Sequence, residues 1–343
     1  MEYIYVVLVN YGGWRDTQEC LESLLKLDYE NFEIVVVDNK SQNQSLEHLV
    51  SWARGEELAS VDNASLAEYS QPPVDKPIDY NVIEWMKEGC VNSGTLKKRR
   101  VTFIQSGENR GFSAGNNVGI SYALSGGDAD YIWLLNNDTV VGRNSLNELV
   151  SKFLLYKKTN EKVGIIGSKL RYYHAPEVIQ AIGGRYSKWL ATTKHVGAFE
   201  VDVGQYDADE SYCGVDYPVG ASMFVCADFI REVGPMCEDY FLYFEELDWV
   251  LRGRVSGWSV GYCSGSEIFH KEGGTIGVAS RASGRSEFSD HLVNLNKLKI
   301  TEVFYPSCIW SVRCSIILVA FNRLRMGMFR RAIMIFKIAV LSK

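Results

Sequence analysis

The sequence lacks the features that mark several common classes of protein. Its 343 residues include eight cysteines, but no two of them form a Cys-x-x-Cys pair and no zinc-ligand spacing occurs. The formal net charge is −6, and the first 300 residues contain no basic stripe with interleaved aromatic residues, which argues against nucleic acid as a partner. Neither a G-x-G-x-x-G fingerprint nor a Walker A loop is present, so dinucleotide enzymes and P-loop ATPases are disfavoured.

The chain also shows no secretory leader and no long uncharged apolar run. Met1 leads into a strand-like segment without a basic leader. Most cysteines stand inside apolar segments, and reduced, buried thiols are the simplest account of them. No uncharged stretch reaches the roughly 18 residues that a membrane-spanning helix needs. These absences predict a cytoplasmic protein.

Strand-like apolar runs alternate with helical segments along the first part of the chain. Helices are expected after Asp16 or Thr17 and over residues 113–123. Strands are expected at residues 3–9, 32–37, 101–104 and 131–135. This alternation predicts an α/β fold with a mixed, mainly parallel sheet and helices on both faces.

The remainder of the chain is less regular. Residues 50–100 are polar and rich in breaks, and we interpret them as a long surface insertion near the site, with some helix over about 80–88. A helix is expected after Glu245 and Glu246. Short strand-like pieces occur at residues 163–168, 182–184 and 217–226.

The C-terminal segment differs from the rest in its charge. From Val303 to the end there are seven basic residues and no acidic one, and the basic residues interrupt apolar stretches. This pattern favours basic amphipathic helices that lie on an anionic membrane surface. A helical hairpin packed on the rest of the protein is the alternative.

Carboxylates stand where two predicted strands end. Asp138 follows the apolar run 131–135, and a carboxylate on a rigid strand end is a good ligand for magnesium or manganese. Asp38 ends the second strand and could accept a hydrogen bond from a nucleotide base or ribose, although Asp-Asn-x-Ser also suits a turn. In parallel sheets ligands bind at the carboxyl ends of strands.

A segment rich in glycine and asparagine, residues 109–119, precedes the fourth predicted strand. Gly111 and Gly115 allow close backbone approach, and the N–H groups that open the following helix could meet a diphosphate. Asn116 and Asn117 are poor helix formers, which indicates a polar role for them.

Acidic residues and a histidine in the second half complete the candidate set. Glu245, Glu246 and Asp248 follow an aromatic run, and crowded carboxylates raise one another's pKa, which suits a general base. Stabilisation of a helix N-terminus is the alternative, and Asp248 could simply pair with Arg252. His270 follows a strand-like run, precedes a glycine pair, and is a possible metal ligand.

Taken together, six segments resemble the family 2 inverting glycosyltransferases, most closely the rhamnosyltransferase-like branch. The match covers roughly residues 3–275. The segments are Val7-Leu8-Val9-Asn10-Tyr11, Val36-Val37-Asp38-Asn39-x-Ser41, Asn109-Arg110-Gly111-Phe112-Ser113-Ala114-Gly115-Asn116-Asn117-x-Gly119, Leu134-Leu135-Asn136-Asn137-Asp138-Thr139, Val219-Gly220-Ala221-Ser222-Met223 and Tyr243-Phe244-Glu245-Glu246-x-Asp248-x-x-x-Arg252. The resemblance implies a GT-A fold, a nucleotide-sugar donor and a divalent cation, Mg or Mn.

The resemblance also implies roles for individual residues. Glu246 matches the general base, Asp138 the metal-binding carboxylate (here in Asn-Asn-Asp rather than Asp-x-Asp), and His270 a downstream metal-binding histidine. The implied donor-binding residues are Asn10, Tyr11, Asp38, Asn39, Arg110, Gly111, Asn116, Asn137 and Asp138. The implied acceptor-binding residues are Gly220, Ala221, Glu245 and Asp248.

The resemblance divides the chain into three parts and suggests a reaction. Residues 1–145 become the nucleotide-sugar-binding half, 146–300 the acceptor-binding and catalytic half, and 301–343 the C-terminal helices. The expected activity is transfer of a sugar, with L-rhamnose as a candidate, to a glycan or lipid-linked glycan in polysaccharide biosynthesis. The protein is expected to be peripheral on the cytoplasmic face of a membrane, in contact through 303–343.

Two other functions remain open. A sugar-nucleotidyltransferase needs a glycine-rich, basic phosphate loop after the first strand, and residues 10–15 match that loop poorly. A non-catalytic nucleotide-sugar-binding protein is the second alternative, and Asp138 together with Glu246 argues against it.

Overall fold

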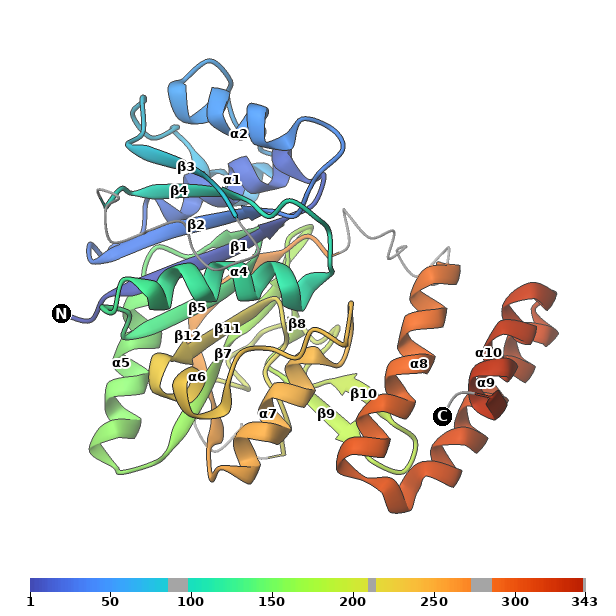
Figure 1. The fold of residues 1–343 in the computed structure, drawn as a ribbon. Coiled ribbons are helices and arrows are strands. Elements are labelled where there is room, and N and C mark those ends of the chain that lie inside the picture. Colours follow the sequence, from blue (N-terminus) through green and yellow to red (C-terminus); the bar gives the residue numbers. More distant parts are fainter. Residues whose placement is uncertain (86–97, 209–213, 273–285, 342–343) are drawn as a thin grey trace.

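The protein consists of an α/β body with three long helices beside it (Figure 1). The computed structural model describes residues 1–85, 98–208, 214–272 and 286–341. In these residues ten strands form one sheet, in the order β3-β4-β2-β1-β5-β11-β7-β12-β6, with β8 paired to β7. The strands are β1 (Ile4–Asn10), β2 (Phe32–Asp38), β3 (Tyr80–Glu84), β4 (Val101–Gln105), β5 (Tyr131–Asn136), β6 (Thr139–Val141), β7 (Val163–Tyr172), β8 (Ala175–Ala181), β11 (Ser222–Cys226) and β12 (Ser259–His270). A separate ribbon pairs β9 (Gly184–Ser187) with β10 (Thr192–His195).

The first half of the sheet is parallel, from β3 through β5. All seven residues of β2 are buried, as expected for a β-branched run that is covered on both faces. Helices α1 (Trp14–Leu24), α2 (Ser45–Arg54) and α4 (Phe112–Ser125) follow β1, β2 and β4. Right-handed crossovers put α1 and α2 on one face and α4 on the other. In Figure 1 the arrowheads of β1 and β2 point toward the side on which the C-terminal helices stand.

Helix α4 approaches β1 closely because glycines face the strand. A Cβ atom added at Gly115 would lie 2.7 Å from Val9 Cγ1, and one added at Gly119 would lie 2.3 Å from Val7 Cγ1. Contacts this short do not occur between real side chains, so these positions require glycine at this helix–strand spacing. The packing brings the N-terminus of α4 to the carboxyl end of β1.

The antiparallel strand β11 joins the two halves of the sheet. It pairs with β5 on one side and β7 on the other, and β12 then runs parallel to β7. Helix α5 (Ser145–Lys158) packs on β7 and β12, and α6 (Ala227–Val233) and α7 (Glu245–Val255) follow β11. The predicted mixed, mainly parallel sheet with helices on both faces and C-terminal helices is confirmed, whereas the division at residues 145 and 300 stays a prediction.

Two local predictions are wrong. Residues 80–84 form strand β3, not part of a helix over 80–88, because the segment pairs in parallel with β4 and extends the sheet edge. Residues 86–88 lie outside the described residues. The rest of this insertion contains the short helices η1 (Ala64–Leu66) and α3 (Ala67–Ser70). The strand expected at 182–184 is also wrong, because β8 ends at Ala181 and β9 begins at Gly184.

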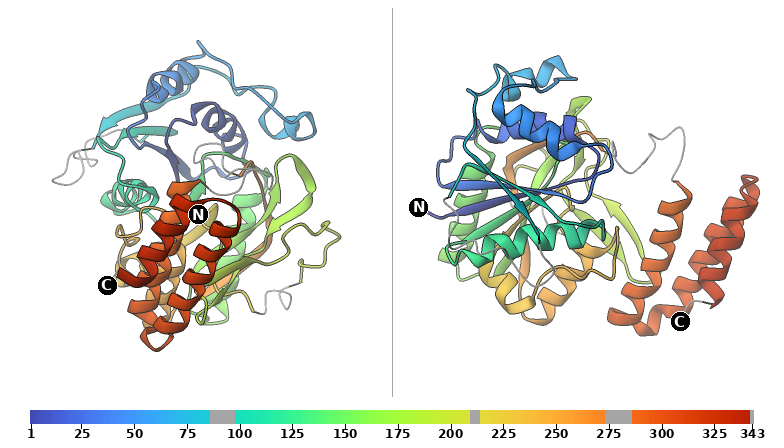
Figure 2. Two further views of the ribbon diagram at one scale, coloured as in Figure 1. Left: turned by 90° about the vertical axis from the view of Figure 1, so that its right-hand side faces the viewer. Right: turned by 45° about the horizontal axis from the view of Figure 1, so that its top comes forward.

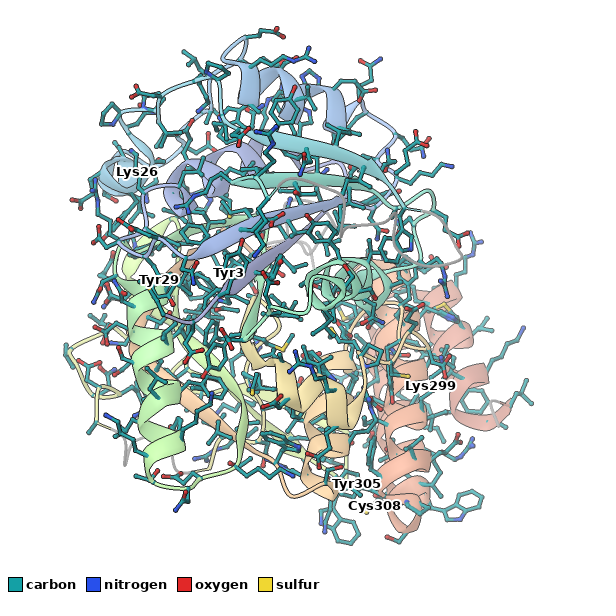
Figure 3. All side chains as sticks on the ribbon, turned by 60° about the vertical axis from the view of Figure 1, so that its left-hand side comes forward. Tyr3, Lys26, Tyr29, Lys299, Tyr305 and Cys308 are labelled. Atoms are coloured by element: carbon teal, nitrogen blue, oxygen red, sulfur yellow. The ribbon has the colours of Figure 1, made fainter. Side chains whose placement is uncertain are left out.

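The C-terminal helices form a unit with a small core of its own. Helix α8 (Glu287–Phe304) leads through η4 (Pro306–Cys308) into α9 (Ile309–Arg325), and α10 (Phe329–Leu341) folds back on α9. Their buried side chains include Val312, Ile316 and Ile335. Tyr305 and Cys308, labelled in Figure 3, mark the bend between α8 and α9. Figure 2 shows the hairpin of α9 and α10 on one outer side of the molecule.

Candidate active site

Polar side chains at the carboxyl ends of β1, β2 and β5 form a buried hydrogen-bond network. Asn10 Nδ2 donates to Asp38 Oδ1 at 2.8 Å, and Thr17 Oγ1 donates to Asn10 Oδ1 at 3.2 Å. Asn137 Nδ2 donates to Thr17 Oγ1 at 2.8 Å. Asp38 also accepts from the hydroxyl and backbone N–H of Ser41, which is the turn considered above as an alternative. A carboxylate has about four positions at which it can accept a hydrogen bond. Asn10 and Ser41 occupy three of them on Asp38, so one acceptor position remains for a hydroxyl group of a ligand.

Asn39 ties the end of β2 to the segment before α4. Its Nδ2 donates to Asn109 Oδ1 at 3.0 Å and to the carbonyl oxygen of Gly111 at 3.1 Å. Gly111 has a φ of +93°, and a Cβ there would lie 2.2 Å from the carbonyl oxygen of Phe241, so only glycine fits. The N–H of Phe112 donates to that same oxygen at 2.9 Å. The start of α4 is therefore fixed between β2 and the segment that leads into α7.

The other polar residues near the start of α4 have different partners. Arg110 is exposed and pairs with Glu238 at 2.8 Å. Asn116 is buried and donates within its own helix to the carbonyl four residues earlier. Asn117 exchanges two hydrogen bonds with the backbone of Met236, at 2.9 and 3.0 Å. Asn117 therefore anchors residues 236–238, a role that was not predicted.

Three of the predicted binding residues, Tyr11, Gly220 and Ala221, lie outside the buried hydrogen-bond network and offer an exposed side chain or backbone groups. Tyr11 follows β1 and is 41% exposed. Gly220 and Ala221 form the turn before β11, and the carbonyl of Ala221 accepts from the N–H of Asn136 at 3.0 Å. The turn thus lies beside the end of β5, close to the candidate metal ligand that follows this strand.

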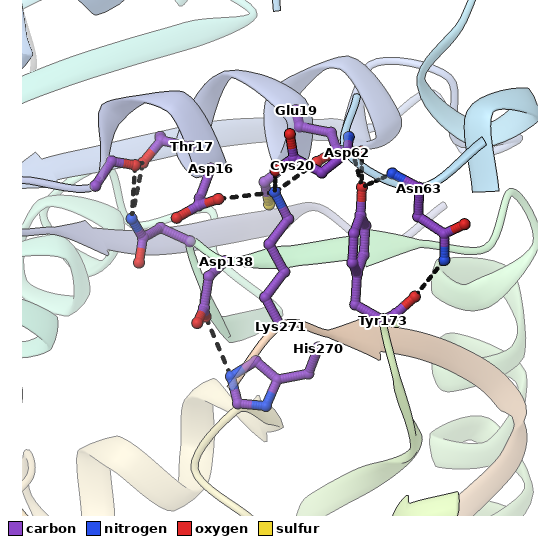
Figure 4. Close-up of polar contacts among 12 residues, drawn as sticks. Asp16, Thr17, Glu19, Cys20, Asp62, Asn63, Asp138, Tyr173, His270 and Lys271 are labelled. Carbon is purple, nitrogen blue, oxygen red and sulfur yellow. Dashed lines mark hydrogen bonds and ion pairs between the residues drawn. The ribbon is translucent and has the colours of Figure 1, made fainter. Parts of the chain in front are cut away.

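Asp138 and His270 meet where the β5–β6 connection lies beside the end of β12. His270 Nε2 is 3.1 Å from Asp138 Oδ1, and Nδ1 is 2.8 Å from Gln180 Oε1 (Figure 4 shows the first contact). An amide oxygen only accepts, so Nδ1 carries a proton and Nε2 faces the carboxylate. Burial lowers the pKa of His270, but the charge and hydrogen bond of Asp138 outweigh burial and raise it. Metal-binding histidines are oriented in this way, with the second ring nitrogen donating to an oxygen.

This pair fits a divalent cation that takes its other ligands from a substrate. Magnesium and manganese are commonly held by one or two carboxylates together with phosphate oxygens and water. In the part of the chain that the structure describes, no group of three or more Asp, Glu, His or Cys side chains is placed to hold a metal. The geometry supports an open site with Asp138 and His270 as protein ligands.

Lys271 stands in an acidic cluster that the sequence analysis missed. Its Nζ lies 2.7 Å from Asp16 Oδ1, 2.7 Å from Glu19 Oε2 and 3.2 Å from Asp62 Oδ2 (Figure 4). Burial lowers the pKa of Lys271, but the carboxylates outweigh burial and raise it. Its backbone N–H donates to the carbonyl oxygen of Asp138 at 3.0 Å. Lys271 thus ties the end of β12 to α1 through its side chain and to the turn of Asp138 through its backbone.

Glu246 lies in the first turn of α7, after a strained stretch of backbone. Tyr243 and Phe244 have φ values of +73° and +74°, which bulky residues rarely adopt and which cluster at functional sites. Asn296 of α8 supports this stretch, since its Nδ2 donates to the carbonyl oxygens of Leu242 and Tyr243 at 2.9 Å each. Asn296 was not predicted; its only sequence signal is an asparagine inside a helical segment.

The acidic residues of α7 differ in their surroundings. Burial raises the pKa of Glu246 to about 7. Burial and the charge of Glu246 raise the pKa of Glu245 well above its usual range, and Glu245 Oε2 has no hydrogen-bond partner among the described residues. Asp248 accepts from Arg252 Nε at 2.7 Å, the alternative considered above. A carboxyl group with a pKa near 7 suits a general base at neutral pH.

The β9–β10 ribbon is electrostatically coupled to the metal-ligand pair, and its neighbour Tyr217 is coupled to Glu246. Burial, with a smaller effect of His270, lowers the pKa of His195 in β10, and His195 pairs with Gly184 in β9. A Cβ at Gly184 would lie 2.2 Å from the ring of Tyr217. Burial and the charge of Glu246 raise the pKa of Tyr217. His195 in the ribbon is therefore within electrostatic range of His270, and Tyr217 beside the ribbon is within electrostatic range of Glu246. The roles assigned to individual residues stay predictions.

A cavity of about 370 Å³ lies outside this set, between β7 and the loop 202–207. Lys169 and Asp202 in its wall are nearly fully buried and pair at 3.1 Å. Arg171 pairs with Glu267 at 2.8 Å. The two basic side chains of this cavity pair with its three carboxylates, and we do not assign catalysis to it.

Parts of the sequence are similar to those of known glycosyltransferases. Residues 5–63 match the model of glycosyl transferase family 2. Over 248 residues the chain is 22% identical to the low-salt glycan biosynthesis hexosyltransferase Agl10 of Haloferax volcanii, a match that spans 71% of this chain and 68% of that protein. The segment that matches the family model, residues 5–63, includes Asn10 and Asp38 of the hydrogen-bond network.

One of the solved structures that resemble this chain has a TM-score above 0.5. The mannosyltransferase PcManGT from Pyrobaculum calidifontis, solved in complex with GDP-Man and Mn²⁺, has a TM-score of 0.52 at 12% identity, covering 99% of this chain and 88% of that one. TarS 1-349 of S. aureus has a TM-score of 0.49 at 12% identity, covering 99% and 81%. The rhamnosyltransferase-like branch stays a prediction. The GT-A-like fold and the family-model match at the N-terminus together support a family 2 glycosyltransferase.

Proposed function

We propose that this protein is an inverting, metal-dependent hexosyltransferase that uses a nucleoside-diphosphate sugar in glycan biosynthesis. The observation that carries the proposal is the pairing of Asp138 with His270 at strand ends, in a protein that also buries Glu246 and so raises its pKa to about 7. The hexosyltransferase relative and the family 2 match support transfer over mere binding of a nucleotide sugar.

The donor is held at the carboxyl ends of the parallel strands. Asp38, prearranged by Asn10, accepts from the base or ribose of the nucleotide. The diphosphate lies toward the start of α4, where the helix dipole favours negative charge. Asp138 and His270 hold the divalent cation, which supplies charge neutralisation for the leaving diphosphate.

Glu246 acts on the acceptor. Its carboxylate removes the proton from the acceptor hydroxyl as the hydroxyl oxygen forms a bond to C1 of the sugar. The bond from C1 to the diphosphate oxygen breaks on the opposite face, so the anomeric centre inverts and the nucleoside diphosphate leaves. A positioned base accelerates such a step by about 10²–10⁴-fold.

The substrates follow from the resemblance and from the C-terminal helices. We propose a hexose or 6-deoxyhexose donor, with L-rhamnose as the first candidate, and a glycan or lipid-linked glycan acceptor. We propose further that the enzyme works on the cytoplasmic face of a membrane, in contact through residues 303–343. The acid-free, basic composition of that segment supports this location.

A thermal-shift screen of nucleotide sugars with and without manganese tests the proposal. A donor that binds the folded protein raises its unfolding temperature, and manganese should increase that shift. The binding donor is then incubated with acceptor or water, and the product is identified. Nucleoside diphosphate supports the proposal; pyrophosphate would assign a sugar-nucleotidyltransferase instead, and no turnover of any bound donor would leave a binding protein.

A further inference from the structure

Helix α9 presents an apolar stripe to solvent on the side opposite its buried residues. Trp310, Leu318 and Phe321 recur at helical spacing and are 75%, 68% and 56% exposed. Val312 and Ile316, on the other side of the same helix, are fully buried in the helical unit. A stripe of large, bare apolar side chains on one element marks an interaction surface, because soluble surfaces rarely expose such contiguous patches.

Helix α10 carries a second stripe of the same kind. Phe329, Ile333, Phe336 and Val340 follow the spacing of one helix face, and each is about half exposed or more. Ile335 is fully buried on another face. In the right-hand view of Figure 2 α9 and α10 stand on the outer side of the molecule. Their exposed stripes belong to one hairpin and are not covered by the residues that the structure describes.

The tip of the β9–β10 ribbon extends this surface. Ser311 Oγ donates to the carbonyl oxygen of Trp189, and Ser315 Oγ donates to that of Leu190 at 3.1 Å. These bonds fix the tip against the first turns of α9. Trp189 and Leu190 are themselves 58% and 48% exposed, so a tryptophan of the ribbon stands beside the end of α9 that carries Trp310. Tryptophan is the residue most typical of the membrane–water interface.

The charges of the hairpin select an anionic partner. No acidic residue occurs between Val303 and the C-terminus. Arg325 and Lys337 have no ion-pair partner among the described residues, and the side chain of Arg330 is 91% exposed with its nearest carboxylate 3.8 Å away. Basic groups beside an apolar stripe match the phosphates and acyl boundary of an anionic lipid surface.

The hairpin contacts also favour helices that lie in the membrane plane. Residues 306–325 are long and apolar enough to cross a membrane by length and composition. A crossing α9 would, however, break the hydrogen bond from Arg313 Nη1 to the carbonyl of Ala339 and the two bonds of 2.8 Å from Arg323 to Asp290 in α8. It would also bring both arginines into hydrocarbon, which is strongly unfavourable.

We infer that the outer stripes of α9 and α10, with Trp189 and Leu190 of the ribbon tip, form one docking surface for an anionic lipid bilayer, on which both helices lie flat. This inference deepens the membrane contact of the proposed function and is independent of the chemistry of transfer. Because α8 also holds the turn before Glu246 through Asn296, docking places the active site at a defined distance from the lipid surface.

Vesicle flotation of the full-length protein tests the surface. Vesicles of phosphatidylcholine mixed with phosphatidylglycerol should bind the protein, pure phosphatidylcholine should bind it weakly, and salt should release part of it. Leu318→Ser and Lys337→Glu should each lower binding to the mixed vesicles, the charge reversal by at least about fivefold. Leu58→Ser and Lys158→Glu are matched controls on exposed residues of the body and should leave binding unchanged.

Three results would overturn the inference. Equal loss in the variants and their controls would show that the hairpin is not the docking surface. Resistance of the bound protein to alkaline carbonate would show a spanning helix. A dimer in solution that Leu318→Ser dissociates, without vesicle binding, would assign the surface to a second copy of the chain.

Unfolding temperature and donor hydrolysis distinguish a loss of membrane docking from unfolding and from a loss of activity. The unfolding temperatures of both variants should equal that of the wild type, since Leu318 is exposed; a large drop would show that the stripe is packed and would refute the inference. Donor hydrolysis in solution should stay normal in both variants, so failure of docking and failure of the proposed function are seen separately.

Discussion

The two sides of the candidate active site are built in opposite ways. At the ends of β1, β2 and β5, polar side chains satisfy one another, and Asn10, Thr17 and Asn137 form a closed network around Asp38. At the start of α7, two aromatic residues hold left-handed backbone angles and Glu245 has an oxygen without a hydrogen-bond partner among the described residues.

The difference indicates a preformed binding side and a strained reacting side. A satisfied network costs nothing to keep rigid, which suits a surface that recognises a constant nucleotide. Burial raises the pKa of Glu246 to about 7, where the proposed base would be most useful, and the strained backbone beside it is typical of functional sites. Changes on the reacting side should therefore alter rate, and changes on the binding side should alter affinity and stability.

The largest effect is expected for Glu246→Gln. The amide keeps the shape of the side chain but cannot take a proton, so transfer should fall by about two orders of magnitude or more while donor and metal binding survive. Steady-state rates and donor titrations measure both. Glu245→Gln is the matched control and should lose less, because its side chain points roughly a quarter-turn away from Glu246 on the same helix. Near-normal turnover in Glu246→Gln would refute the assignment of the base.

Lys271→Met should give the largest loss of stability. It leaves Asp16 and Glu19 without their cation, and removing one partner of a buried pair costs about 3–5 kcal/mol of unfolding free energy. The variant should also bind manganese less tightly, because Lys271 holds the turn of Asp138. Lys169→Met, which breaks a buried pair outside the site, should lose comparable stability with normal manganese affinity. Equal manganese affinity in both variants would limit Lys271 to a purely structural role.

Asp138→Asn should weaken metal-dependent donor binding by about tenfold to a hundredfold or more. The amide is a poorer ligand than the carboxylate, while the fold should persist because the residue lies in a connection between strands. Donor titration with and without manganese measures the change. Unaltered, chelator-sensitive turnover in the variant would contradict the metal assignment.

The pH dependence of transfer should follow Glu246. Because its pKa is raised to about 7, the protonated, inactive form persists up to that pH, so the rate should fall as pH drops below about 7 and level off above it. Between pH 6 and pH 8 the change should be about tenfold. The residual activity of Glu246→Gln should lack this dependence, and a rate that increases toward acid would be inconsistent with a carboxylate base.

Asn296→Ala should have the smallest effect of the set. Loss of its bonds to Leu242 and Tyr243 should lower the unfolding free energy by about 1–2 kcal/mol and the rate by several-fold, since the turn before Glu246 loosens. Asn294→Ala is the control, because Asn294 is also buried in α8 but donates to its own helix. If Asn296→Ala and Asn294→Ala lower the rate equally at equal stability, the support of the turn before Glu246 by Asn296 does not matter for the rate.

Much of the architecture could be predicted from local pattern. Strands β1, β2, β4 and β5 could be recognised from their β-branched runs, because strands buried on both faces need uninterrupted apolar sequence. The helix predicted over 80–88 failed because a short, half-polar segment has no clear period, and pairing with β4 decided its conformation. The ribbon of β9 and β10 was missed for the same reason.

The sequence by itself determined the order of strands and helices and which segments bring Asp38, Asp138 and Glu246 to strand and helix ends, because those features follow from local periodicity and composition. Tertiary structure alone decided that Lys271 meets Asp16 and Glu19, that Asn296 supports the turn before Glu246, and that the pKa of Glu246 is near 7. The reason is physical: hydrogen bonds, ion pairs and desolvation act between groups that are close in space, and these partners are from about 50 to more than 250 positions apart in the chain.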